Sequence, residues 1–178
     1  MTADNFISVG IFNGFSWIRC EGKGSFLNSP SVKTFGDARI SAGETLVIVD
    51  LESCTGMDST FMGTLAGMSA RITARDGGAL HIAEPGSRNL RSLEDLGLDH
   101  LMEIDPPNAA WKNDIESIRS ALKSPSAAAI DTIQRAKHVL EAHQNLSGLN
   151  EKNAREFSGV LSVLKSNLSG QDAHPEAT

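Results

Sequence analysis

Three consecutive polar residues, Asp58, Ser59 and Thr60, precede the apolar stripe of a predicted helix. Side chains at a helix start accept hydrogen bonds from free backbone N–H groups, and such caps stabilise a helix by about 0.5–2 kcal/mol. The same N–H groups and the positive end of the helix dipole favour an anionic group. A phosphate on Ser59 would bring about −1.5 to −2 charges to this point at neutral pH. The triplet is therefore either a structural cap or a site of regulatory phosphorylation with its hydroxyl displayed at the helix entrance.

Other side chains that could do chemistry give weaker signals. The loop from Gly22 to Ser25 lacks the spacing of a Walker A phosphate loop. The histidines show no zinc-ligand spacing, so we expect neither a metal nor a cofactor. They are His81, His100, His138, His143 and His174.

The two cysteines, Cys20 and Cys54, lie in apolar or strand-like surroundings. We expect reduced, part-buried thiols, as in a reducing cytoplasm. Cys54 is near the Asp58–Thr60 segment and could act as a nucleophile if His81 or His100 approached it in space. An enzyme built around Cys54 ranks last among the alternatives, and we expect the chain not to be an enzyme.

The segment that positions these residues alternates strands with helices. Strands are predicted from runs of β-branched and apolar residues at Phe6 to Phe12, Phe15 to Glu21, Thr45 to Leu51, Ala79 to Ala83 and Leu101 to Ile104. Asn13-Gly14 predicts a hairpin between the first two strands. Helices are predicted from Ser29, with Pro30 at the first helical position, after Asp58, and from Ser87 to Leu96. This order predicts an α/β fold, a mixed β-sheet with helices packed on one face.

The segment after Pro106-Pro107 has no strand signal. Helices are predicted at Trp111 to Lys123 and Ser126 to Leu146, and Asn150 is predicted to cap a last helix. The apolar repeat of the last two helices extends over too few residues for a coiled coil. A helical hairpin that docks on a partner or on its own domain is the better interpretation. The tail after Gly170 is expected to be disordered.

Composition excludes several classes of function. Of the 178 residues, 40% are apolar, which is enough to build a core. The net charge of −6 argues against binding to nucleic acid, because phosphate backbones require a Lys/Arg footprint. No apolar run approaches the roughly 20 residues that span a bilayer, and no signal peptide is recognisable. We therefore expect a cytoplasmic protein.

The run from Leu46 to Leu65 resembles the signature of the STAS domain family, named for sulphate transporters and anti-sigma factor antagonists. In that family a hydrophobic strand ending in Asp-Leu leads to a Met-Asp-Ser-Ser/Thr turn and a Gly-containing helix, as Asp50-Leu51 and Met57-Asp58-Ser59-Thr60 do here. The loop and helix start at Gly22 to Val32, and the order of elements from Gly77 to Leu98, extend the resemblance to about residues 5–105. It implies a STAS-like domain at residues 1–107, a helical extension at 108–170 and a tail at 171–178.

By this resemblance, Ser59 is the residue that an anti-sigma factor serine kinase phosphorylates and a phosphatase resets. The unphosphorylated form would bind the kinase-type anti-sigma factor and free a sigma factor, and the phosphorylated form would let go. The partner-binding residues implied are Asp58, Thr60, Ser25 and Met57. Three residues depart from the family pattern. Ser25 stands where many antagonists carry Asp, Gly24 stands at a position that is usually apolar, and Phe61 stands where the family has Gly.

An alternative within the same family is an accessory subunit that docks on a membrane transporter ATPase without being phosphorylated. The C-terminal helices have no counterpart in antagonists of this type, which usually end near the sheet domain. They suggest a homodimer or a second partner.

Overall fold

A computed structural model of the chain describes residues 4–126 and 129–172. Its sheet has the strand order β1-β2-β3-β5-β6, and β4 pairs with the far end of β2. β1 and β2 are antiparallel, and the other pairs are parallel. The strands are β1 Phe6–Phe12, β2 Phe15–Gly24, β3 Leu46–Asp50, β4 Cys54–Met57, β5 Ala79–Ala83 and β6 Glu103–Ile104. The sheet is therefore mixed, as predicted.

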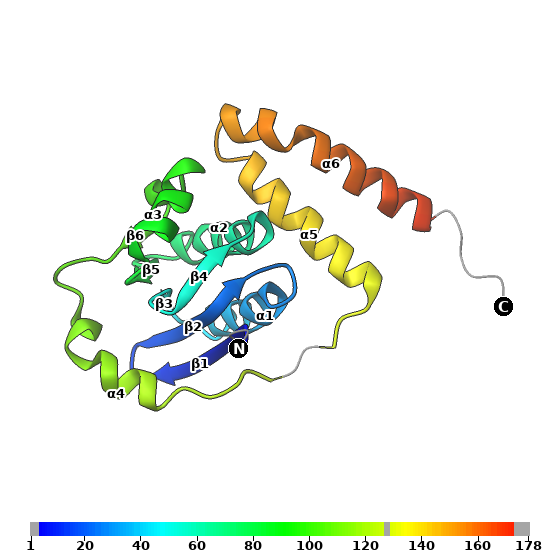
Figure 1. The fold of residues 1–178 in the computed structure, drawn as a ribbon. Helices are drawn as coiled ribbons and strands as arrows, with labels where there is room; N and C mark the ends of the chain where they lie inside the picture. Colours follow the sequence, from blue (N-terminus) through cyan, green and yellow to red (C-terminus); the bar gives the residue numbers. More distant parts are fainter. Residues whose placement is uncertain (1–3, 127–128, 173–178) are drawn as a thin grey trace.

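Three helices follow strands of the sheet, and three more form the C-terminal part (Figure 1). The helices are α1 Ser29–Ser41, α2 Ser59–Thr73, α3 Gly86–Asp95, α4 Ile115–Ser120, α5 Thr132–Ser147 and α6 Glu151–Asp172. Short 3-10 turns, Leu98–His100 and Ala110–Asp114, precede β6 and α4. In Figure 1, α5 lies beside α2 and α6 lies outside α5.

Two hydrophobic clusters lie on opposite faces of the sheet because successive strand residues point to opposite sides. Ile18, Val47 and Val49 belong to the larger cluster, together with the apolar residues of α1, α2 and α3. Trp17 and Ile48 belong to the second cluster. Residues of α4 and of the segments directly before and after it complete this cluster. The segment from Ala110 to Ser120 thus covers the face that α1–α3 leave free.

Most predicted elements appear close to their expected bounds, and the prediction of an α/β fold with C-terminal helices is confirmed. The Asn13-Gly14 turn joins β1 and β2, and Gly14 has a φ of 89°, which glycine adopts without steric cost. β4 was missed, because Cys54–Met57 lies in a segment predicted to be a loop. The helix predicted at Trp111 to Lys123 is wrong in length, since a 3-10 turn leads into the short helix α4.

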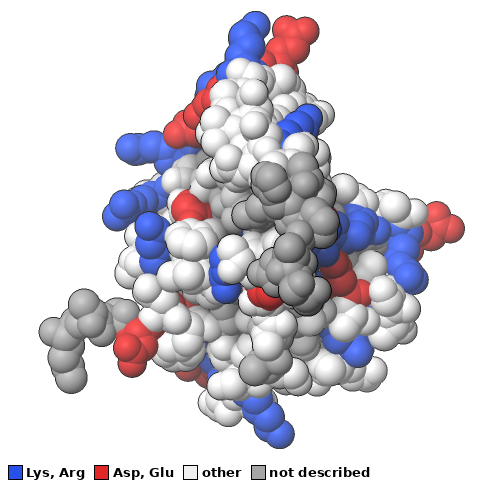
Figure 2. Space-filling view, turned by 90° about the vertical axis from the view of Figure 1, so that its right-hand side faces the viewer, with Lys and Arg blue, Asp and Glu red and all other residues white. Residues whose placement is uncertain are grey.

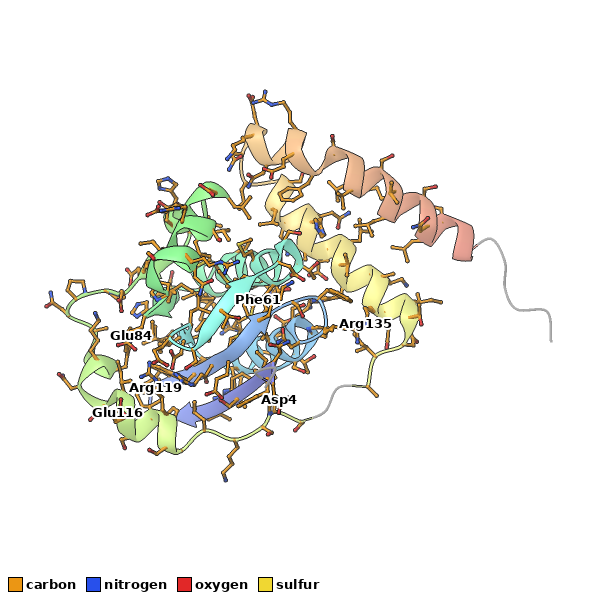
Figure 3. All side chains as sticks on the ribbon, viewed as in Figure 1. Asp4, Phe61, Glu84, Glu116, Arg119 and Arg135 are labelled. Carbon is orange, nitrogen blue, oxygen red and sulfur yellow. The ribbon has the colours of Figure 1, made fainter. Side chains whose placement is uncertain are left out.

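A buried carboxylate ties α4 to the sheet. Asp50 is fully buried at the end of β3 and accepts hydrogen bonds from Trp17 Nε1 at 3.2 Å, Arg19 Nη1 at 2.8 Å and Arg119 Nε at 2.9 Å. Burial acts to raise the pKa of Asp50, but the hydrogen bonds from Arg119 and Arg19 prevail and hold it below its ordinary value. Arg119 also pairs with Glu84, and both side chains lie near α4 in Figure 3.

Two of the departures from the family pattern, Gly24 and Phe61, compete for the same space. Phe61, at the start of α2, is fully buried. A Cβ atom at Gly24 would lie 2.8 Å from Cγ of the Phe61 ring, which is closer than van der Waals contact. The ring at position 61 therefore fills the volume that an apolar side chain at position 24 would take.

We expect Phe61→Ala to lower the free energy of unfolding by about 3–5 kcal/mol, because it leaves a cavity above Gly24. Gly24→Val alone should also destabilise the domain, because its side chain meets the Phe61 ring. In the double variant the new valine fills the cavity, so the double variant should be more stable than Phe61→Ala. Urea denaturation of the four proteins measures the coupling, and strictly additive losses would contradict this account.

Candidate functional site

The site is built where β4 runs into α2. Asp58 is the N-cap of α2, and its Oδ1 accepts a hydrogen bond from the Phe61 backbone N–H at 2.8 Å. Its Oδ2 accepts a second from the Phe26 N–H at 2.8 Å, so the carboxylate joins the start of α2 to the turn before α1. Ser59 is the first residue of α2, at the positive end of the helix dipole. The predicted cap is therefore confirmed.

The Ser59 hydroxyl is hydrogen-bonded to a histidine from the C-terminal part of the chain. Ser59 Oγ lies 3.0 Å from Nε2 of His143 in α5. The other ring nitrogen, Nδ1, lies 2.8 Å from the backbone oxygen of Val139. Because a carbonyl can only accept, Nδ1 carries the proton and Nε2 of the neutral ring is an acceptor. Ser59 is therefore the donor, and His143 is held in one tautomer.

Helix α5 reaches Ser59 because α2 presents glycines to it. A Cβ atom at Gly63 would lie 2.1 Å from the backbone oxygen of Ala142, and its three nearest neighbours all belong to Ala142. One turn later, a Cβ atom at Gly67 would lie 2.5 Å from Nδ2 of Asn145. The Asn145 amide donates to the Gly63 carbonyl at 3.2 Å. The two helix backbones thus approach at a distance that only glycine at position 63 allows.

A second histidine of α5 lies in the same interface. His138 is buried, and its Nε2 is 2.8 Å from Ser29 Oγ of α1 and 3.4 Å from Thr64 Oγ1 of α2. Burial lowers the pKa of His138, and the positive charge of Lys33 adds to the effect. His138 therefore favours the neutral form while α5 is docked.

Charged residues surround this interface. Arg71 of α2 pairs with Asp37 of α1 at 2.7 Å and lies 3.9 Å from Glu141 of α5. Arg135, labelled at the near end of α5 in Figure 3, donates to the backbone oxygen of Phe26 at 2.9 Å. Figure 2 shows basic and acidic side chains together on the side of the molecule that carries α5 and α6. Complementary charges thus add to the apolar and hydroxyl contacts of α5.

The structure places the five predicted site residues around the start of α2, at different depths. Asp58, Ser59 and Met57 are half-buried, whereas Thr60 and Ser25 are buried. In this arrangement the Ser59 hydroxyl is half-buried at the helix entrance and is hydrogen-bonded to His143. His143 and His138 were missed as site residues, since their contacts cross about eighty residues or more of sequence.

The remaining candidates for chemistry are engaged elsewhere. Cys20 and Cys54 are both buried and not joined by a disulfide. The hydrogen bond from the Cys20 thiol lowers the pKa of Cys54 to about 7, while the same contact raises the pKa of Cys20. His81 accepts a hydrogen bond from Trp111 Nε1 at 3.0 Å and pairs with Glu103.

Within residues 4–126 and 129–172, no histidine is hydrogen-bonded to Cys54, and no group of three His, Cys, Asp or Glu side chains could hold a metal ion. None of the helices in this part of the chain combines the length and apolar character needed to cross a bilayer.

The family model for the STAS domain matches residues 7–109, so the chain belongs to the STAS domain family. The fold is similar to that of a putative anti-sigma factor antagonist from Thermotoga maritima, with a TM-score of 0.52, 18% identity, and coverage of 64% of this chain and 94% of the other. An anti-sigma factor antagonist from Mycobacterium paratuberculosis gives a TM-score of 0.50 at 17% identity, covering 65% of this chain and 95% of the other. At these identities the likeness establishes the fold. No curated protein sequence matches the chain.

The lowered pKa of His138 makes the docking of α5 sensitive to pH. A released His138 returns to an ordinary pKa of about 6.5, so the released state binds more protons at mildly acidic pH and docking weakens as the pH falls below that value. The charged groups that face His138 are Lys33, Asp58, Arg71, Arg135 and Glu141.

We expect NMR signals of α5 to shift toward those of a released helix between about pH 7.5 and 5.5. In His138→Gln, which keeps a hydrogen-bonding side chain but does not titrate, this response should shrink. A response of undiminished size in His138→Gln would show that another group is responsible.

Proposed function

We propose that the chain is an anti-sigma factor antagonist-like signalling protein that is switched by phosphorylation of Ser59. Its unphosphorylated form binds a kinase-type anti-sigma factor and so frees a sigma factor. The observation that carries the proposal is the position of the Ser59 hydroxyl at the N-terminus of α2, beside the capping Asp58, in a chain of the STAS family. The fold that the chain shares with the two antagonists above also supports it.

The chemistry of the switch needs only the Ser59 hydroxyl from this chain. The kinase transfers the γ-phosphoryl group of ATP to Oγ, the O–H bond breaks, and ADP and a proton leave. Free N–H groups at the start of α2 favour the resulting dianion. The Asp58 carboxylate is already held by two backbone N–H groups, so the repulsion between the two anions changes the surface without removing the cap.

The proposed partner-binding residues lie around this hydroxyl. Met57 and Asp58 are half-buried and offer surface directly, while Thr60 and Ser25 lie beneath it. The chain itself performs no catalysis in this proposal. A separate serine kinase adds the phosphate, a separate phosphatase removes it, and all three proteins work in the cytoplasm.

The C-terminal helices also support a proposed homodimer. Val160 and Val163 of α6 have exposed fractions of 43% and 60%, and a second copy could cover them.

The assigned site is tested by mixing the full-length chain with a kinase-type anti-sigma factor and ATP. We expect intact-protein mass spectrometry to detect one added phosphate on the wild type and none on Ser59→Ala. The unphosphorylated protein should also be retained by the immobilised anti-sigma factor, and the phosphorylated protein should elute.

Ser92→Ala is the matched control, because Ser92 is also a half-buried serine on a helix of the same domain. It should accept the phosphate like the wild type. Full phosphorylation of Ser59→Ala would refute the site, and retention by a transporter ATPase in place of the anti-sigma factor would favour the accessory-subunit alternative.

A further inference from the structure

Helix α2 is covered on two sides. Its apolar stripe faces the sheet and includes Phe61, Leu65, Met68 and Ile72, which are all fully buried. A second face, rotated away from this stripe by the helical repeat, consists of small and hydroxyl residues and packs against α5. Thr60 and Thr64 on that face are buried too. A helix that packs only on a sheet needs one buried face. The second buried face of α2 therefore indicates a binding site for another helix.

The second face of α2 is shaped for a helix that crosses it at short distance. Ala142 of α5 lies directly over Gly63, in contact through its backbone. Substitution at Gly63 would therefore oppose the docking of α5 more than it opposes the fold of the STAS domain. The small side chains at Gly63 and Ala142 allow the two helix backbones to come into contact.

A phosphate on Ser59 would remove the hydroxyl proton that Ser59 donates to the docked α5. Oγ and His143 Nε2 are at hydrogen-bond distance, and His143 itself is buried. The Val139 carbonyl fixes the proton on Nδ1, so Nε2 of the neutral ring is an acceptor that needs the Ser59 hydroxyl proton. Phosphorylation removes this proton and places a bulkier group between Ser59 and His143, so both changes break the contact seen in the docked arrangement.

We propose that the Gly63 face of α2 is a helix-binding surface whose occupant in the free protein is the chain's own α5–α6 hairpin. The docked hairpin covers Ser59 and the surface around it, so it competes with the protein partner and with the kinase. A phosphate on Ser59 excludes the hairpin. Since coupling between two equilibria on one site is reciprocal, docking disfavours the phosphorylated state of Ser59 at equilibrium by the factor by which phosphorylation weakens docking.

The competition with a partner rests on the proposed function, whereas the docking equilibrium and its response to a phosphate do not.

Gly63→Ala tests the docking in the full-length chain. Alanine favours a helix over glycine, so the STAS domain should stay folded, but its Cβ meets the Ala142 backbone. We expect hydrogen exchange of α5 amides to accelerate about tenfold or more, while the strands keep their protection.

Gly159→Ala is the matched control, because Gly159 lies in α6 with no neighbour within 4 Å of the added Cβ. It makes the same chemical change in a helix and should leave the exchange of α5 unchanged. Equal exchange of α5 in Gly63→Ala and the wild type would overturn the proposal.

A phosphoserine introduced genetically at position 59 tests the exclusion without any kinase. We expect α5 exchange in this protein to rise about tenfold or more. Unchanged exchange would overturn the proposal, whatever the outcome of partner binding.

The rate at which the kinase-type anti-sigma factor phosphorylates Ser59 then tests the competition. Gly63→Ala should react faster than the wild type and Gly159→Ala at the wild-type rate. Equal rates in Gly63→Ala and wild type, with α5 released, would overturn the competition. If none of the three proteins is phosphorylated, the proposed function fails, and the exchange of the phosphoserine protein still decides whether a phosphate excludes α5.

Discussion

The backbone contact between Gly63 of α2 and Ala142 of α5 determines how the rest of the site is arranged. Because no side chain separates the two helices there, the residues of α5 on either side of the contact reach the domain surface. His143 then meets the Ser59 hydroxyl, and His138 meets Ser29 at the start of α1. A single methyl group at position 63 would separate all these pairs at once, because they lie on one rigid helix.

The segment around α4 and helix α5 are attached to opposite sides of the domain by different kinds of contact. On one face, the segment around α4 is held by a second hydrophobic cluster and by Arg119, which forms a buried ion pair with Asp50. Removing Arg119 would take away one of the two guanidinium groups that compensate the buried Asp50 carboxylate, so this attachment resists change. On the other face, Leu146 of α5 and Phe157 of α6 are buried in the larger hydrophobic cluster, and α5 also forms hydroxyl–imidazole hydrogen bonds, one close backbone contact and half-exposed ion pairs. The polar contacts are individually weak, and those of Ser59 and His138 would change on phosphorylation or protonation.

Local signals predicted most of the fold. The Asn13-Gly14 hairpin, the apolar runs of β3 and β5, and the caps at Asp58 and Asn150 all depend on neighbours a few residues away. β4 escaped prediction because Cys54–Met57 has no apolar alternation and is defined by its pairing with β2. The covering of Ser59 escaped for a similar reason, since its partner lies 84 residues further along the chain. Gly63 and Gly67, one turn apart on α2, were the available sign of a close helix contact, but glycine spacing does not say which helix makes it.

The hydrogen bond from Ser59 to His143 is the most direct measure of whether the C-terminal hairpin covers the phosphorylation site. Two-dimensional 15N–1H NMR of the imidazole ring reports which nitrogen carries the proton. The account predicts a single tautomer of His143 in the full-length chain, with the proton on Nδ1 and a lone pair on Nε2. A His143 ring protonated at Nε2, or exchanging freely between tautomers as an exposed histidine does, would show that α5 does not rest on Ser59 and would contradict the central claim.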